Sequence, residues 1–155
     1  MSGFSLTLLH DFIVKAKSAT YIGDGPRSLS CRPGSRDLQF HQEPFAYLDS
    51  YFGSANFVGQ EVVYFAGRPV WAMNYHGCLL EPALLSASDV GRMLKESLSA
   101  LYKEGRFLGG FEYAAPNGTY VDTNEGGIEM FTGREWIVRD GRKAYELLYH
   151  GGFVE

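Results

Sequence analysis

A glutamate and a histidine recur together at two places in the chain, and this pair is the first candidate for chemistry. Glu61 precedes His76, and Glu135 precedes His150 at the same spacing. A carboxylate and an imidazole can share proton transfer, and two such pairs could also surround a metal ion. Within one hairpin, however, the two side chains would lie about 13 Å apart, and no HExxH motif occurs. We therefore expect no metal site; the alternative role of the histidines is to bond to the backbone at strand ends.

Each of these glutamates has large apolar neighbours in sequence. Glu61 lies close to Val63 and Phe65, and Glu135 is followed by Trp136. A carboxyl group in apolar surroundings has a raised pKa and can act as a general base or accept a ligand cation. The alternative is a structural salt bridge, for which the nearby candidates are Arg68, Arg134 and Arg142.

Two arginines form a second candidate site. Arg32 and Arg36 flank Pro-Gly-Ser in the long segment 23–36, GDGPRSLSCRPGSR. Guanidinium groups beside exposed Gly and Ser amides could clamp a carboxylate or a phosphate, although the pattern is not a P-loop. The alternative is that both arginines pair with acids such as Asp37 or Asp49 and fasten the segment to the sheet.

Aromatic residues between these groups could form the walls of a binding site. The candidates are Tyr64, Trp71, Tyr75, Trp136 and Tyr145, with Asn74 as a polar contact close to Trp71. Aromatic rings can stack on a ligand, but in most proteins such residues belong to the core. No GxSxG motif is present, so nucleophilic catalysis has little support.

The glutamates, the histidines and the aromatic candidates lie in two segments that match each other without a gap. Residues 57–77 read FVGQEVVYFAGRPVWAMNYHG, and residues 131–151 read FTGREWIVRDGRKAYELLYHG. Upstream, Tyr-Leu-Asp-Ser at 47–50 matches Tyr-Val-Asp-Thr at 120–123. We interpret the chain as one domain, residues 1–155, with an internal repeat of about 5–78 and 86–152.

Both segments predict a β-hairpin with a two-residue turn, at Ala66-Gly67 and at Asp140-Gly141. Simple alternation on that register places Trp71 on one face of the first hairpin and Glu61, Asn74 and His76 on the other. The same alternation separates Tyr145 from Glu135 and His150 in the second hairpin. One face would pack on helices, and the other would line a cavity or contact a partner.

Two helices should support the hairpins. The first spans Leu6 to Lys17 and the second Asp89 to Lys103, each with an apolar stripe, and Ser86 and Asp89 have capping-box spacing. The predicted fold is α+β, with internally duplicated α-β-β-β units that form a largely antiparallel sheet. Both helices would pack on one face of this sheet.

Several of these stretches resemble a bacterial family known as domain-of-unknown-function family 5680. They are AKSATY (16–21), CRPGSRDL (31–38), YLDSYFG (47–53), FVGQEVV (57–63), VWAMNYHG (70–77) and YELLYHGG (145–152). Some members carry an N-terminal helix-turn-helix segment, which implies an effector-sensing role; this sequence starts directly at its first predicted helix. The predicted architecture is also similar to the effector-binding domains of multidrug-responsive regulators, which hold flat cations in an aromatic pocket with a buried carboxylate.

Composition narrows the class of function. The chain has 155 residues, 45% of them hydrophobic, and a formal net charge of −4, which suits a folded domain without a nucleic-acid partner. No apolar stretch is long enough to span a membrane, so we expect a cytoplasmic protein. The leading hypothesis is a domain that binds a small molecule in a cavity on the sheet, without a cofactor. The alternatives are a Glu/His acid–base enzyme and a protein-interaction or homodimerisation module.

Overall fold

The computed structural model describes residues 3–23 and 27–155. Two α-helices, a π-helical turn and nine strands make up this described part of the chain. Their bounds, in chain order, are α1 Leu6–Lys17, the π-helical turn Ser18–Ile22, β1 Arg27–Ser28, β2 Arg36–Gln42, β3 Phe45–Gly53, β4 Phe57–Phe65, β5 Arg68–Leu79, α2 Ala87–Lys103, β6 Phe111–Ala115, β7 Gly118–Gly127, β8 Met130–Arg139 and β9 Arg142–Phe153.

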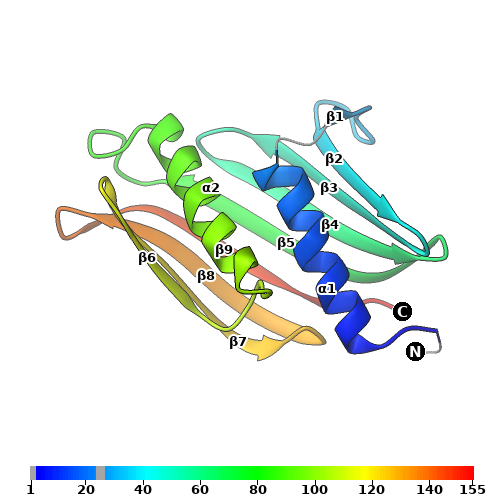
Figure 1. Cartoon of the computed structure of the whole chain (residues 1–155). Helices are drawn as coiled ribbons and strands as arrows, with labels where there is room; N and C mark the ends of the chain where they lie inside the picture. The colour runs from blue at the N-terminus through cyan, green and yellow to red at the C-terminus, as the bar shows by residue number, and fades with distance from the viewer. Residues whose placement is uncertain (1–2, 24–26) are drawn as a thin grey trace.

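The strands form one antiparallel sheet in the order β1-β2-β3-β4-β5-β9-β8-β7-β6 (Figure 1). The last strands of the two halves, β5 and β9, therefore lie side by side at its centre, where Tyr75 is paired with Tyr149. The prediction of an α+β fold with an antiparallel sheet is confirmed, but the predicted α-β-β-β units are wrong: in the described residues, five strands follow α1 and four follow α2. Each strand pairs with a neighbour in sequence or across this central junction, as hairpin connections favour.

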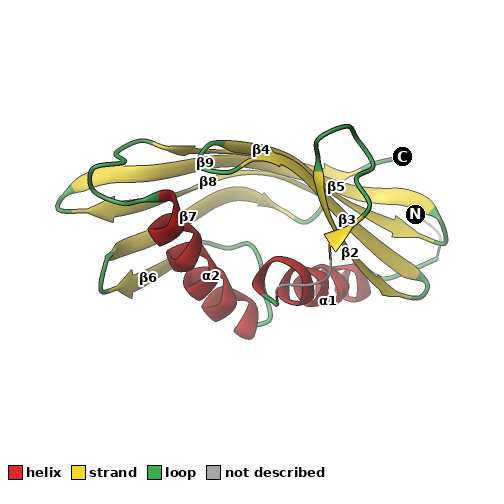
Figure 2. Cartoon of the chain, turned by 90° about the horizontal axis from the view of Figure 1, so that it is seen from above, coloured by secondary structure: helices red, strands yellow, loops and turns green. Residues whose placement is uncertain are grey.

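Both helices lie on the concave side of the curved sheet (Figure 2). Helix α1 buries Leu9, Phe12, Ile13 and Ala16 of the apolar stripe that its sequence predicts, whereas Leu6, which also belongs to that stripe, is exposed. Helix α2 begins with the predicted capping box, because the Ser86 side chain accepts from the backbone of Asp89 and the Asp89 side chain accepts from the backbone of Ser86. One continuous core cluster joins residues of both helices to the inner face of the sheet.

The two predicted hairpin turns are confirmed. Ala66 and Gly67 have φ values of 48° and 78°, and Asp140 and Gly141 have 50° and 70°. Two successive positive φ values give the tight turn whose twist suits the right-handed twist of the strands.

The predicted assignment of side chains to the two faces is wrong, because a β-bulge interrupts each hairpin. Val63 pairs with Trp71 rather than with Val70, so Val70 is one residue more than its partner strand can match. Ile137 likewise pairs with Tyr145, and Ala144 is the additional residue. One added residue reverses the facing of every later side chain on that strand.

As a consequence, Trp71 shares the inner face with Glu61, and Tyr145 shares it with Glu135. Trp71 and Tyr145 are fully buried, and each glutamate is 7% exposed. The histidines His76 and His150 point to the opposite, solvent-exposed face.

The long segment 23–36 lies only partly within the described residues, because residues 24–26 fall outside them. Its later part is held against the sheet through Asp37, which accepts hydrogen bonds from the Cys31 backbone and the Ser35 and Ser50 side chains. Burial opposes ionisation of Asp37, but these hydrogen bonds lower its pKa to about 2.

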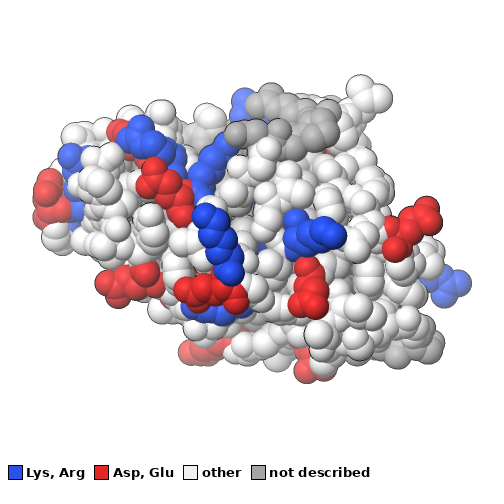
Figure 3. Space-filling view, in the orientation of Figure 1, with Lys and Arg blue, Asp and Glu red and all other residues white. Residues whose placement is uncertain are grey.

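The surface over the helices carries mixed charges. Figure 3 shows acidic and basic side chains interspersed there, and no continuous area of one sign covers the described residues on this face. Neither helix in the described ranges is long and apolar enough to cross a membrane.

Candidate functional site

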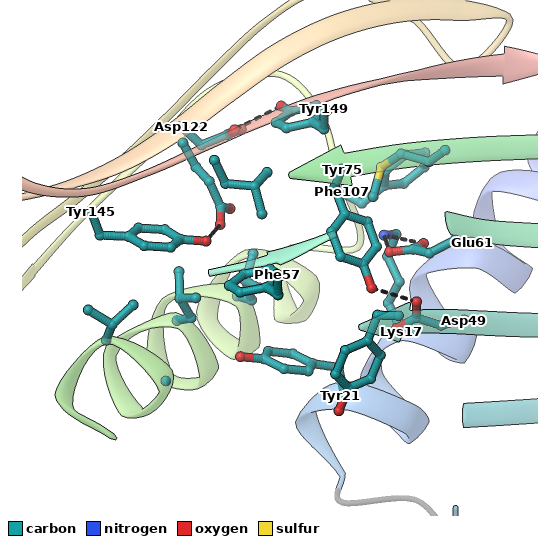
Figure 4. Close-up of a pocket in the computed structure, with 18 of the residues that line it drawn as sticks. Lys17, Tyr21, Asp49, Phe57, Glu61, Tyr75, Phe107, Asp122, Tyr145 and Tyr149 are labelled. Atoms are coloured by element: carbon teal, nitrogen blue, oxygen red, sulfur yellow. Dashed lines mark hydrogen bonds and ion pairs between the residues drawn. The ribbon is translucent and has the colours of Figure 1, made fainter. Parts of the chain in front are cut away.

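A cavity of about 330 Å³ lies between the two helices and the centre of the sheet (Figure 4). Its floor consists of inward-facing side chains of β3, β4, β5, β7, β8 and β9, and α2 supplies an apolar wall that includes Val90, Leu94 and Leu98. Arg36, Gly53 and Ala87 also line it and are exposed, so the cavity opens near the first turn of α2. A concave, mostly apolar site with a few converging polar groups is typical of small-molecule binding.

Two tyrosines occupy the middle of the floor, and each donates to an aspartate. The Tyr75 hydroxyl lies 2.7 Å from Asp49 Oδ1, and the Tyr149 hydroxyl lies 2.8 Å from Asp122 Oδ1. Figure 4 shows both contacts at the cavity.

Two glycines of the matching segments make room for these rings. A Cβ atom on Gly59 would lie 2.3 Å from the Tyr75 hydroxyl oxygen, and one on Gly133 would lie 2.2 Å from Tyr149 Cζ. The rings therefore cross the neighbouring strand where no side chain stands, which explains why each segment has a glycine two residues before its glutamate.

Glu61 forms a buried ion pair with the last residue of α1. The Lys17 ammonium lies 2.7 Å from Oε1, in hydrogen-bond geometry, and 2.6 Å from Oε2. Lys17 is 5% exposed and also lies 5.7 Å from the centre of the Phe107 ring. The ammonium is thus held by a carboxylate and an aromatic face together.

Glu135 has a different environment, although it matches Glu61 in sequence. Tyr120 donates to its Oε2 at 2.6 Å and Tyr145 donates to its Oε1 at 3.1 Å. Burial raises the pKa of Glu135 to about 7, against the lowering effect of the tyrosine hydrogen bonds. The pKa of both tyrosines is raised by burial and by the nearby carboxylate, so both remain hydrogen-bond donors.

Each glutamate stands opposite an aspartate on the neighbouring strand. Asp49 is paired with Glu61, and Asp122 is paired with Glu135, so the carboxyl groups of each pair are on one face and close together. Burial, followed by the charge of Glu61, raises the pKa of Asp49 above its usual range. Burial raises the pKa of Asp122 to about 6.

Of the residues selected from the sequence, Glu61, Glu135 and Arg36 line the cavity. Arg36 is exposed at the opening. Arg32 lies outside the cavity lining and fastens the loop, since its guanidinium donates to the Ser50 carbonyl at 2.7 Å and to the Ser50 hydroxyl at 2.9 Å.

The remaining selected residues lie elsewhere. Trp71 is part of the core, where its ring stacks on Phe131 and its Nε1 donates to the carbonyl of Ile128. Asn74 and His150 face each other on the outer side of the sheet, with Nδ2 and Nε2 3.3 Å apart. The sheet therefore separates the histidines from the glutamates, and the two do not form a common site.

The sequence indicated Tyr75 as an aromatic candidate, but sequence reasoning missed several other residues of the site, chiefly Lys17, Asp49, Asp122 and Tyr149. A usable signal was present, because the aspartates and the tyrosines both recur in the matching segments. Their inward direction depends on the bulges. Among the described residues, no group of three or more His, Cys, Asp or Glu side chains is arranged to hold a metal ion.

The family model described as "Domain of unknown function (DUF5680)" matches residues 49–154. The chain belongs to this family. Among the described residues, the four carboxyl groups that line the cavity lie within the part that matches DUF5680, whereas Lys17 lies before it. No curated protein and no solved structure is significantly similar to the chain.

Proposed function

We propose that this DUF5680 protein binds a small organic molecule in the cavity between its helices and its sheet. The observation that carries the proposal is the cavity itself: about 330 Å³ in volume, apolar on the α2 side, and polar on the floor. Ligand sites of this size combine apolar walls with a few placed polar groups that orient the ligand. Here those groups are tyrosine hydroxyls and carboxyl groups.

We also propose that the cavity lies on an approximate two-fold axis between repeated halves. The central Tyr75–Tyr149 pair joins matching residues, and the bulges occur at matching positions. The bulge carbonyls are used in the same way in both halves. Leu80 N donates to the Ala144 carbonyl at 2.9 Å, and Val154 N donates to the Val70 carbonyl at 3.1 Å.

A thermal-shift screen of the purified chain tests the binding proposal. The panel should contain small aromatic amines, alcohols, carboxylates, sugars and nucleotides. A ligand at about 100 times its dissociation constant stabilises the fold by about 2.7 kcal/mol, which corresponds to a rise of about 5–10 °C in the unfolding midpoint.

Gly91 offers a matched variant that blocks the cavity. It lines the cavity on α2, one helical turn from Ala87 and Leu94, and a Cβ atom there would meet nothing within 4 Å. Gly91→Leu should therefore fold normally and abolish the ligand-induced shift, while Gly91→Ala should retain most of it. A shift of equal size in Gly91→Leu would place the ligand elsewhere, and the absence of any hit would argue against the proposal.

A further inference from the structure

Each half of the cavity contains one aspartate and one glutamate, but different groups pair with these acids in the two halves. In one half, the Asp49–Glu61 pair has the Lys17 ammonium between helix and sheet. In the other half, tyrosine hydroxyls donate to Asp122 and Glu135, and among the described residues no ammonium group forms an ion pair with either acid. Arg36 is the other basic residue of the lining among the described residues, and it is exposed at the opening.

Asp122 has an unsatisfied oxygen. Its Oδ1 accepts from Tyr149, but its Oδ2 has no hydrogen-bond partner among the described residues, although the side chain is only 4% exposed. Leaving a buried carboxylate oxygen without a partner is costly, and such an atom calls for an explanation, which a bound ligand can supply.

Lys17 shows how this cavity holds a positive charge. Its ammonium contacts the Glu61 carboxylate and lies over the Phe107 ring. The second half also offers carboxyl groups and aromatic side chains in the cavity lining, since the hydroxyl of Tyr145 donates to Glu135 and that of Tyr149 donates to Asp122. Aromatic faces attract cations most strongly where water is excluded.

We propose that the ligand carries an organic ammonium group and that Asp122, with Glu135 beside it, accepts this group. The inference rests on the binding function proposed above. The ligand's cation would take, in the second half, the role that Lys17 has in the first, and its apolar part would lie against α2.

The pKa values of the two acids add a proton linkage. Because burial raises the pKa of Asp122 to about 6 and that of Glu135 to about 7, a cation must displace protons from them at low pH. Affinity for an ammonium ligand should therefore rise with pH through this range. The other charged or titratable groups that face the two acids are Tyr149 and Tyr145 of β9, Tyr120 of β7, Tyr102 of α2, Lys17 of α1 and Arg106 of the loop after α2.

Three probes of similar shape test the inference: 4-phenylbutylamine, 4-phenylbutanol and 4-phenylbutyrate, with binding measured by calorimetry. We expect the amine to bind most tightly. Asp122→Asn, which retains the oxygen that accepts from Tyr149, should weaken the amine by about tenfold or more and leave the alcohol unchanged. Asp140→Asn makes the same chemical change in the exposed β8–β9 turn and should change neither the affinity for the amine nor that for the alcohol.

The outcomes separate this inference from the binding proposal. Binding of the alcohol or the carboxylate at least as tightly as the amine would overturn the ammonium inference and leave the cavity as a binding site. Amine binding that Asp122→Asn does not weaken would also overturn it. If Asp122→Asn fails to fold, the affinity of the wild-type protein for the amine is measured between about pH 5.5 and pH 8. An affinity that does not rise with pH over this range would contradict the proposed role of Asp122 and Glu135. No binding of any probe or of the wider panel would reject both proposals.

Discussion

The buried ion pair between Lys17 and Glu61 makes a quantitative prediction about stability. Lys17→Met keeps the apolar stem of the side chain and removes the charge, which leaves Glu61 beside Asp49 without a cation. Removing one partner of a buried ion pair costs about 3–5 kcal/mol, because the other charge stays buried and uncompensated. Both side chains are less than one-tenth exposed, so solvent screening does not reduce this figure much.

The assay is urea unfolding of the wild type and four variants, supported by thermal melts: Lys17→Met, Glu61→Gln, the double variant and the control Lys143→Met. For a chain of this length, a loss of about 3–5 kcal/mol lowers the midpoint by about 6–20 °C. The double variant Lys17→Met/Glu61→Gln removes both charges of the ion pair and should recover most of the loss, so the two single changes are strongly non-additive.

Lys143→Met is the matched control, because Lys143 also pairs with a glutamate, Glu146, but on the surface. An exposed pair contributes about 0–1 kcal/mol, and this variant should melt within a few degrees of the wild type. If Lys17→Met costs no more than Lys143→Met, or if the double variant loses the sum of its two parts, the ion pair does not have the role described here.

Two further predictions concern the floor of the cavity. Gly59→Ala should lower the free energy of unfolding by about 1–3 kcal/mol, since its Cβ would overlap Tyr75. Gly91→Ala should instead raise the free energy of unfolding by about 0.5–1 kcal/mol. Equal effects of the two variants in urea unfolding would contradict the packing described. Burial raises the pKa of Glu135 from 4.5 to about 7 and that of Asp122 from 3.8 to about 6. The folded chain therefore holds protons that the unfolded chain releases, and the free energy of unfolding should fall as pH rises through this range. For Glu135 alone, the fall should be about 2–3 kcal/mol between about pH 5 and pH 8. Stability that is flat or rises between these pH values, with Asp122→Asn/Glu135→Gln behaving like the wild type, would refute the raised pKa values.

Local sequence chemistry was sufficient for the two hairpin turns and for the start of α2. The Ala66-Gly67 and Asp140-Gly141 turns follow from residues that accept positive φ, and α2 begins where Ser86 and Asp89 can cap it. Each of these signals involves residues a few positions apart, so neighbouring residues alone determine them. The antiparallel pairing of β4 with β5 and of β8 with β9 follows directly.

The selection of Glu61 and Glu135 as cavity residues also came from the sequence, through their apolar neighbours and their recurrence. The groups that surround the two glutamates could not be predicted from the sequence. Lys17 is separated from Glu61 by most of the first half of the chain, and only the packing of α1 on the sheet brings them together. The burial of Asp122, which leaves its Oδ2 without a partner among the described residues, likewise depends on tertiary packing.

The tertiary structure alone decided which side chains face the cavity. In each hairpin, one added residue in the second strand, Val70 or Ala144, reverses the alternation. Each bulge is accompanied by a long-range hydrogen bond, because the Val70 carbonyl accepts from the N–H of Val154 and the Ala144 carbonyl accepts from the N–H of Leu80. The pattern of residues along a single strand does not indicate these long-range bonds or the bulges. The bulges nevertheless direct Tyr75 and Tyr149 into the cavity and the two histidines towards solvent.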